Sequence, residues 1–286
     1  MRTKQAKKRS FMRIHSDYHV HTRWSGDSKA PMAAQVEAAV RAGLTELCFT
    51  DHLDMDFPYH NVPDISFGCF ELDIESEYRE YLALKERYLD RIRLFFGIEL
   101  GLMPGLAPKL DAYVEMHPEF DFIIGSTHVV HGMDPYYPNF YEGRTEEAAY
   151  REYFETILQN VREFSRFQVC GHLDYIVRYG PNQDREYSYE KYRDLIDPIL
   201  ETLVKNGNGL EINTAGLKKG CRDCNPCRDI LKRYRSLGGE IITIGSDAHV
   251  PENIAGGFEF ARQALLESGF SYYATFEAKK PVMHRL

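Results

Sequence analysis

The chain has 286 residues, a net charge of −8 at pH 7, 43% hydrophobic residues and 27% charged residues. This composition fits a folded protein with an ample core, and the length is normal for one α/β barrel. The acidic balance disfavours a nucleic-acid-binding protein. Because no apolar run approaches the roughly 18 residues that span a bilayer, the sequence excludes a transmembrane helix.

The amino-terminal residues and the cysteines indicate the cellular compartment of the protein. Residues 1–10 are basic but lack the apolar stretch of a secretory signal peptide. We expect them to form a disordered tail, and residues 11–286 to form one domain. The six cysteines do not suggest the disulfide scaffold of a small secreted protein. We therefore expect a cytoplasmic protein.

Short apolar segments alternate with longer amphipathic segments along the chain. Strands are predicted over residues 11–19, 47–50, 92–99, 122–126, 167–170, 209–213 and 240–245, and helices over residues 31–42, 72–90, 146–164, 189–205, 226–237 and 253–268. Strict alternation favours a parallel sheet in an α/β fold. Seven strands favour a closed or nearly closed barrel related to the eight-stranded TIM barrel. A doubly wound open sheet is the alternative.

Candidate metal ligands stand at the ends of six of the seven predicted strands. In a parallel barrel the carboxyl ends of all strands open onto one face, so these side chains should converge there. In the extended pairs His19 and His21, and Asp247 and His249, residues two apart point the same way. The full set of candidate ligands is His19, His21, Asp27, His52, Glu99, His128, His172, Asp247 and His249.

The chemistry of this set indicates transition metals. Imidazole together with carboxylate suits zinc, iron or manganese, whereas magnesium and calcium prefer sites made of oxygen alone. A catalytic zinc ion takes about three protein ligands, so nine candidates exceed the needs of one ion. Glu99 has two carboxylate oxygens and could bridge two ions. The sequence therefore predicts a cluster of three divalent transition-metal ions.

The motifs around these residues resemble those of the PHP (polymerase and histidinol phosphatase) superfamily. Within it, the chain is similar to the monofunctional histidinol-phosphate phosphatases, over roughly residues 13 to 280. The resemblance implies a distorted (β/α)7 barrel with a trinuclear metal centre. The motifs are His19-Val20-His21-Thr22, Ser25-Gly26-Asp27, Thr50-Asp51-His52, Gly97-Ile98-Glu99, Gly125-Ser126-Thr127-His128, Gly171-His172-Leu173-Asp174 and Gly245-Ser246-Asp247-Ala248-His249.

The resemblance also implies how the ligands are shared and what reaction they serve. One ion would be held by His19, His21, Glu99 and Asp247, a second by Glu99, His128 and His172, and a third by Asp27, His52 and His249. Some relatives have histidine at the position of Asp27, a difference that favours manganese or iron over zinc in the third site. A hydroxide bridging two ions would attack a phosphomonoester in line, without a phosphoenzyme.

Four charged residues are candidates for supporting roles. Asp17 and Asp51 lie beside the ligand strands, where they could orient imidazoles or assist catalysis. Arg178 and Lys218 follow strand ends and could neutralise the phosphate of a substrate. The resemblance implies basic residues near the substrate at similar positions. Lys218 stands where arginine is more usual, and lysine lacks the bidentate geometry of arginine. An ordinary surface or capping role is the alternative for each.

Two further segments carry weaker indications. The aromatic residues 135–141 follow His128 and could wall a pocket for an imidazole-bearing substrate, although ordinary aromatic packing is the alternative. The run that contains Cys221, Cys224 and Cys227 supplies three thiolates, one fewer than a structural zinc site of four cysteines needs. Its spacing also differs from that of a ferredoxin cluster. A loop that tolerates cysteine is the preferred interpretation, although a lowered pKa in the first turn of a helix could make Cys227 oxidisable.

Together these features predict an enzyme of histidine biosynthesis. We expect a metal-dependent phosphomonoesterase that hydrolyses L-histidinol phosphate to L-histidinol and phosphate, the reaction of EC 3.1.3.15. Its partner would be a small phosphate ester. Two alternatives stay open at this point: a phosphoesterase acting on another small phosphomonoester or a nucleotide, and a metal-binding barrel without catalytic activity.

Overall fold

A computed structural model describes residues 14–62 and 65–286, so the predicted tail lies outside the described residues. Seven strands pair in the order β1-β2-β4-β5-β6-β7-β8, and every pair is parallel. A short strand, β3, extends the parallel pairing along the later part of β4. The strands are β1 (Ser16–Asp17), β2 (Glu46–Phe49), β3 (His52–Leu53), β4 (Arg93–Gly101), β5 (Phe122–Ser126), β6 (Val169–Cys170), β7 (Gly209–Asn213) and β8 (Ile242–Gly245).

The sheet curls into a nearly closed barrel because β1 returns to lie beside β8. The backbone N–H of Tyr18 donates to the carbonyl of Ile244 at 3.1 Å. The buried carboxylate of Asp17 accepts from the N–H and the hydroxyl of Ser246, at 2.9 and 2.5 Å, and from the N–H of Ala255 at 3.1 Å. We call these contacts the β1–β8 seam. The predicted barrel is confirmed, and the open sheet is wrong.

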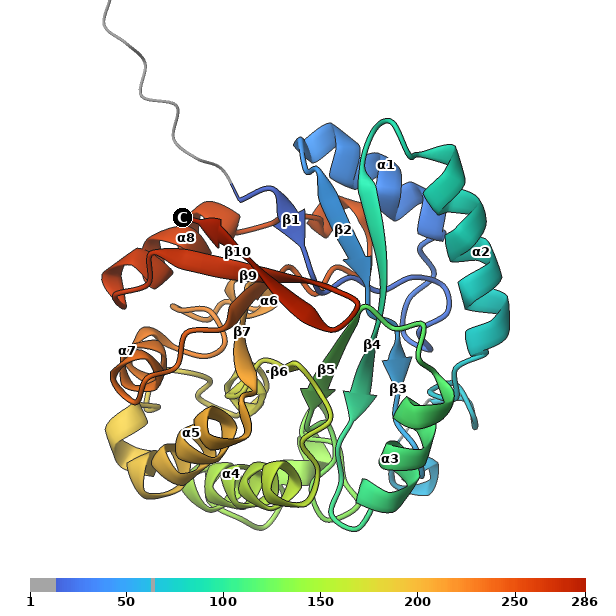
Figure 1. The fold of residues 1–286 in the computed structure, drawn as a ribbon. Helices are drawn as coiled ribbons and strands as arrows, with labels where there is room; N and C mark the ends of the chain where they lie inside the picture. The colour runs from blue at the N-terminus through green and yellow to red at the C-terminus, as the bar shows by residue number, and fades with distance from the viewer. Residues whose placement is uncertain (1–13, 63–64) are drawn as a thin grey trace, which may run out of the picture.

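Helices surround the barrel on its outside (Figure 1). Their ends follow local rules: Asp73 and Thr145 cap the starts of α2 and α4 by accepting from backbone N–H groups, and left-handed Gly43 and Gly207 end α1 and α5. Within the described residues, no helix has the length and apolarity to cross a membrane. The helices are α1 (Met32–Ala42), α2 (Ile74–Arg87), α3 (Ala107–Met116), α4 (Glu146–Glu163), α5 (Arg193–Asn206), α6 (Ala215–Lys218), α7 (Arg228–Ser236) and α8 (Phe258–Glu267).

A hairpin that the sequence analysis did not predict closes the amino-terminal end of the barrel. It consists of β9 (Tyr272–Glu277) and β10 (Lys280–Arg285), which pair antiparallel, and it crosses the barrel in Figure 1. Phe276 stacks on Phe122 with ring centroids 5.1 Å apart, and its carbonyl accepts from the Tyr18 hydroxyl at 2.9 Å. Apolar side chains therefore fill this end, which leaves the opposite end for polar chemistry.

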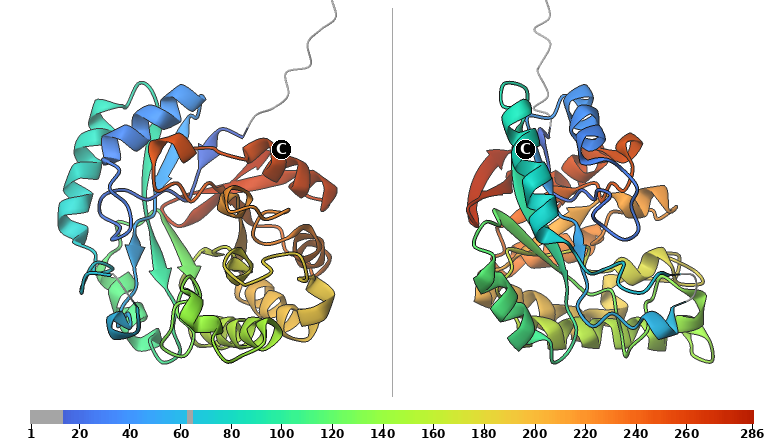
Figure 2. Two further views of the ribbon diagram at one scale, coloured as in Figure 1. Left: turned by 180° about the vertical axis from the view of Figure 1, so that it is seen from behind. Right: turned by 90° about the vertical axis from the view of Figure 1, so that its right-hand side faces the viewer.

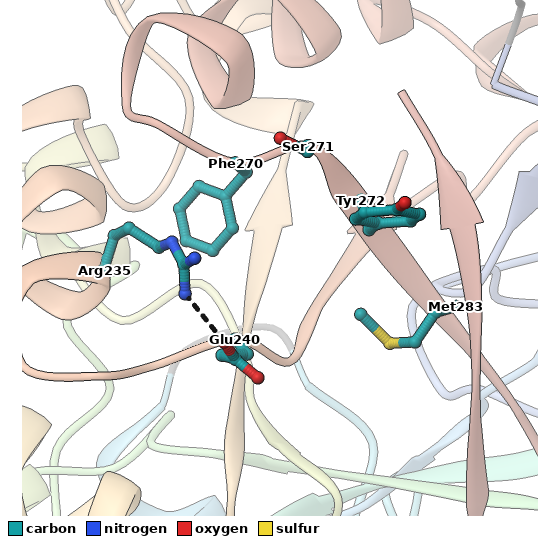
Figure 3. A pocket seen from close by; sticks show the side chains of 6 residues that line it. All are labelled: Arg235, Glu240, Phe270, Ser271, Tyr272 and Met283. Atoms are coloured by element: carbon teal, nitrogen blue, oxygen red, sulfur yellow. Dashed lines mark hydrogen bonds and ion pairs between the residues drawn. The ribbon is translucent and has the colours of Figure 1, made fainter.

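A pocket of about 410 Å³ lies beside this hairpin (Figure 3). Glu240 precedes β8 and pairs with Arg235 at 3.2 Å across the pocket, so the pocket belongs to the amino-terminal side of the strands. The side view in Figure 2 shows the hairpin at one end of the molecule and the loops that follow the strands at the other. The pocket thus lies away from the predicted ligands. Its lining residues are Arg235, Glu240, Phe270, Ser271, Tyr272 and Met283.

Candidate metal centre

The carboxylate of Glu99, on β4, is fully buried and lies at the centre of a cluster of imidazoles. Its Oε2 atom is shared by three rings and its Oε1 atom by two. These rings come from segments next to or within β1, β3, β5 and β6, whose carboxyl ends meet because the strands are parallel. The ring nitrogens lie 2.9–3.5 Å from the carboxylate oxygens and belong to His19, His21, His52, His128 and His172.

The remaining predicted ligands extend this cluster on one side. The Oδ1 atom of Asp247 lies 3.3 Å from Nε2 of His21 and 3.5 Å from Nδ1 of His249. The Oδ2 atom of Asp27 lies 3.0 Å from Nε2 of His249 and 3.8 Å from Nε2 of His52. The structure therefore brings all nine candidate residues together at the carboxyl ends of the strands.

Several subsets of this cluster have the spacing of a metal site. Within each subset, one nitrogen or oxygen atom per residue lies within 4.8 Å of the others. One subset includes Asp54, which was not among the nine. The subsets are His19, His21 and Glu99; Glu99, His128 and His172; His21, His52 and His249; His19, His172 and Asp247; and His52, Asp54 and His128.

The hydrogen bonds of His21 show that the cluster suits a cation. Ser25 donates its hydroxyl proton to Asp51 at 2.5 Å, so the 3.0 Å contact between Ser25 and Nδ1 of His21 requires the proton to be on the ring. Nε2 of His21 then directs a lone pair at the oxygens of Glu99 and Asp247, and it has no hydrogen-bond partner among the described residues. Buried acceptors that face one another need a donor or a cation between them.

The pKa values in the cluster describe its charges. Burial would lower the pKa of His19 and His128, but nearby carboxylates raise both well above their usual value. Burial would raise the pKa of Glu99 and Asp247, but His19 and other neighbouring imidazoles hold both well below their usual range. Burial, aided by adjacent imidazoles, lowers the pKa of His21. The carboxylates are therefore ionised, as metal binding requires.

Sequence reasoning missed Glu211, which holds the ring of His19 and the backbone of His172. Its Oε1 atom lies 2.6 Å from Nδ1 of His19, and its Oε2 atom accepts from the backbone N–H of His172 at 2.9 Å. Such partners fix the orientation and tautomer of a ligating imidazole. Glu211 lies on β7, two residues before Asn213, so both side chains point the same way. This polar pair inside an apolar strand could have revealed it.

Sequence reasoning also missed Asp54, which follows β3. Its Oδ1 atom lies 2.8 Å from Nδ1 of His128 and holds that ring as Glu211 holds His19. Gly101, at the end of β4, makes room for it, because a Cβ atom there would overlap the Asp54 carboxylate. The glycine is therefore needed for a close approach between side chain and backbone.

The two carboxylates expected to assist catalysis lie beside the cluster and face other donors. Asp17 forms part of the β1–β8 seam. Asp51 accepts from the N–H and hydroxyl groups of both Thr22 and Ser25, at 2.5–3.2 Å. Asp51 reaches His21 through the hydroxyl of Ser25, so its contact with the cluster is indirect.

The two expected phosphate-binding residues lie at different depths. Arg178 is almost completely buried and donates to Asp247 at 2.9 Å, Asn213 at 2.7 Å and Asn225 at 2.8 Å. Of its five N–H groups, two remain for another acceptor. Lys218 is exposed, and its ammonium group donates to a backbone carbonyl.

Aromatic rings continue outward from the cluster. The ring of Tyr175 lies 5.8 Å from that of His128 and 5.0 Å from that of His172. Tyr175 contacts Tyr179 at 5.0 Å, and Tyr179 contacts Tyr136 at 4.9 Å. We call Tyr136, Tyr175 and Tyr179 the tyrosine wall. The predicted aromatic segment thus reaches the cluster through two tyrosines outside it.

In the described part of the chain, none of the groups with the spacing of a metal site includes a cysteine thiol. Cys227 is the N-cap residue of α7. Burial nevertheless raises its pKa, as it raises that of Cys224 and brings that of Cys221 to about 11. The expectation of a lowered pKa at Cys227 is therefore wrong, because desolvation outweighs its position at a helix start.

A parallel α/β barrel that gathers buried imidazoles and carboxylates at the carboxyl ends of its strands has the architecture of a metal-dependent hydrolase. The family model described as the PHP domain matches residues 17–215, more than half of the chain. The chain therefore belongs to the PHP domain family.

The chain is similar to curated and solved proteins along nearly its whole length. It is 32% identical to the histidinol-phosphatase of Lactococcus lactis, over 92% of this chain and 95% of that protein. It is also 32% identical to a Thermotoga maritima protein named probable histidinol-phosphatase, over 94% and 99% of the two chains. The crystal structure of the Lactococcus lactis phosphatase, complexed with zinc, L-histidinol and phosphate, matches with a TM-score of 0.82 at 30% identity, over 94% and 98% of the chains.

Proposed function

We propose that this protein hydrolyses L-histidinol phosphate to L-histidinol and inorganic phosphate, a step of histidine biosynthesis. The observation that carries the proposal is the convergence of the nine candidate ligands into one cluster with Glu99 at its centre. The similarity to a histidinol-phosphatase over more than nine-tenths of both chains supports it. The presence of L-histidinol and phosphate in the solved relative supports a small phosphate ester as the substrate here.

We propose that the cluster holds three divalent transition-metal ions, for which zinc, iron and manganese have suitable ligand preferences. The zinc in the solved relative supports zinc as one candidate. The first ion would contact His19, His21, Glu99 and Asp247, the second Glu99, His128 and His172, and the third Asp27, His52 and His249. Two of these sets contain a subset with metal-site spacing, and the third shares His52 and His249 with such a subset.

Such ions, when bound, lower the pKa of coordinated water and offset negative charge on a phosphoryl group. The protein's part is to hold the ligands and to orient the ester. Glu211 and Asp54 fix the rings of His19 and His128. Arg178 lies beside Asp247 with two free N–H groups, so we propose that it donates to a phosphate oxygen. Lys218, which is exposed, would add positive charge at the outer edge of the site.

A substrate panel tests the proposal. Protein loaded separately with zinc, manganese or ferrous iron should release phosphate from L-histidinol phosphate with a far higher kcat/KM than from p-nitrophenyl phosphate or AMP. Equal values on all three esters would leave a phosphatase but remove the proposed substrate. A preference for AMP would favour a nucleotide phosphatase, and no turnover with any metal would favour a non-catalytic barrel.

Two substitutions test the site itself. Glu99→Gln and His128→Ala should each reduce kcat by at least about 100-fold, because both remove a proposed ligand, while circular dichroism remains that of the wild type. His117→Ala is a matched control, since His117 pairs with Glu119 after α3 and away from the cluster. Full activity in either site variant would remove that residue from the proposed centre.

A further inference from the structure

Asp134 is a buried carboxylate that the proposed metal centre does not use. Its side chain is 9% exposed, and its Oδ1 atom accepts from the backbone N–H of Tyr136 at 2.8 Å. Among the described residues, no lysine, arginine or histidine nitrogen lies within 4.0 Å of it. A carboxylate buried without a counter-ion is unfavourable, and burial raises the pKa of Asp134 to about 7.

A tight turn brings Asp134 back toward the segment that carries His128, because Val130 and Met133 pair through two backbone hydrogen bonds of 2.8 and 3.0 Å. The hydrogen bond from Tyr136 holds Asp134 at the edge of the tyrosine wall. The imidazole of His128 is close enough to act on its charge. The charge of Asp134 in turn adds to the effect of burial in raising the pKa of Tyr175 and Tyr179, and it acts in the same way on Tyr137. A ligand extending from the cluster along the wall would therefore pass near this carboxylate.

The side chain of Lys219 forms cation–π contacts with the tyrosine wall. The ammonium group of Lys219 lies 5.9 Å from the ring centroid of Tyr136 and 5.5 Å from that of Tyr179. Aromatic faces attract cations at such distances. Lys219 does not pair with Asp134, so the carboxylate remains free to pair with a different cation.

We propose that Asp134 determines substrate specificity by pairing with a cationic group on the organic half of the ester, while the phosphate lies at the metal centre. The substrates selected would be phosphomonoesters that carry a protonated amine or imidazole. This inference rests on the proposed phosphatase function and deepens it. The tyrosine rings would pack against the same group, since a flat cationic ring is well suited to an aromatic surface.

Asp134→Asn tests the inference, because asparagine keeps the side-chain size and the oxygen that accepts from Tyr136 but removes the charge. Loss of a hydrogen bond to a charged group should lower kcat/KM for L-histidinol phosphate about 10- to 100-fold, mainly through KM. The kcat/KM for p-nitrophenyl phosphate, whose organic half carries no cation, should stay unchanged. Bound metal and inhibition by inorganic phosphate should also match the wild type.

Asp56→Asn serves as the matched control. Asp56 follows β3, and its exposed carboxylate pairs with Lys109, so this variant removes one charge without touching the proposed subsite. It should behave as the wild type on both esters. Equal losses by Asp134→Asn on both esters would indicate a structural role and overturn the inference, as would no loss on either.

A second pair of esters separates this inference from the proposed function. O-phosphoethanolamine carries an ammonium group, and glycerol 3-phosphate carries no cation. If the wild type fails to prefer L-histidinol phosphate, the proposed substrate is wrong. A loss in Asp134→Asn confined to O-phosphoethanolamine would still support cation recognition by Asp134, and equal behaviour of the two esters would contradict it.

Discussion

The ability of His19 to bind a metal depends on the partner of its other ring nitrogen. Nδ1 faces Glu211 at 2.6 Å and Nε2 faces Glu99 at 3.0 Å. When a carboxylate accepts the Nδ1 proton, a neutral ring presents an unprotonated Nε2. Glu211 therefore orients the ring of His19 so that Nε2 faces Glu99, where a bound ion would displace the Nε2 proton, and Asp54 orients His128 in the same way.

We predict that Glu211→Gln weakens metal binding or activity by about 10- to 100-fold, because a neutral amide is a poorer acceptor for the Nδ1 proton of His19. Metal content after dialysis against a weak chelator gives the loss of affinity, and kcat in excess metal gives the loss of activity. Glu46→Gln is the control, since Glu46 is a buried glutamate on β2 that pairs with Arg93. Wild-type metal retention and kcat in Glu211→Gln would contradict the positioning role.

Glu77, on α2, should make the stability of the folded protein depend on pH. It is completely buried, and no described residue forms a hydrogen bond of 3.5 Å or less with either carboxyl oxygen. Burial, followed by the nearby charge of Asp51, raises its pKa well above 4.5. The folded state therefore holds this proton more tightly than the unfolded chain. The resulting stability is complete below about pH 4.5 and is lost as the pH rises through the folded pKa.

Glu77→Gln has no such proton to lose. Its free energy of unfolding should be close to that of the wild type at about pH 5 and should exceed it at about pH 8. Urea denaturation at the two pH values measures the difference. Glu75→Gln, an exposed change on the same helix, should show no such pH dependence. A constant difference between Glu77→Gln and the wild type at both pH values would show that Glu77 does not titrate in this way.

The β9–β10 hairpin contributes stability at the end of the barrel opposite the metal centre. Phe276 is almost completely buried and packs on Phe122 inside the barrel. Phe276→Ala should lower the free energy of unfolding by about 3–5 kcal/mol, the usual effect of deleting a buried phenylalanine. Metal content and kcat of the folded protein should be unchanged.

Denaturant unfolding measures this change, with Val282→Ala on the exposed face of β10 as the control. A wild-type midpoint in Phe276→Ala would mean that the hairpin does not stabilise the barrel. Loss of bound metal in the folded variant would mean that the two ends of the barrel are coupled.

The elements differ in how well the sequence predicts them. β5 and β7 have the predicted bounds because they are apolar runs between polar turns. β10 was missed because it is largely exposed and contains Pro281, so it shows no apolar alternation. α3 was missed because only Leu110 and Val114 are buried along it, which leaves little helical periodicity. β1 covers Ser16–Asp17 of the strand predicted over residues 11–19, and residues 11–13 lie outside the described part of the chain.

The residues of the site also divide into those that the sequence predicts and those that it does not. The nine candidate ligands could be predicted because parallel strands bring their carboxyl ends together whatever the details of packing. Glu211, Asp54 and Asp134 could not, because their roles depend on contacts between distant segments. For Asp17 the position in the sequence suggested a role in catalysis. In the structure its carboxylate instead accepts hydrogen bonds from Ser246 and Ala255 in the β1–β8 seam.

For the molecule as a whole, the cluster brings carboxylates and imidazoles from both ends of the chain together around the buried Glu99. A cation bound there stabilises the folded state, by about 2.7 kcal/mol at 100 times its dissociation constant. Removal of metal by a strong chelator should therefore lower Tm by several degrees, and added zinc or manganese should restore it. Glu99→Gln should show a smaller change. A Tm indifferent to chelator and metal would indicate that the cluster holds no ion.

The β1–β8 seam also sets the order of events during synthesis. His19 and His21 leave the ribosome early, whereas Asp247 and His249 follow more than two hundred residues later. Until β8 has emerged and joined β1, the nascent chain has His19, His21 and Glu99 but lacks Asp247 and His249, and the barrel is not closed. Completion of the cluster is therefore one of the last steps in the maturation of each molecule, and a chain that terminates before β8 lacks Asp247 and His249.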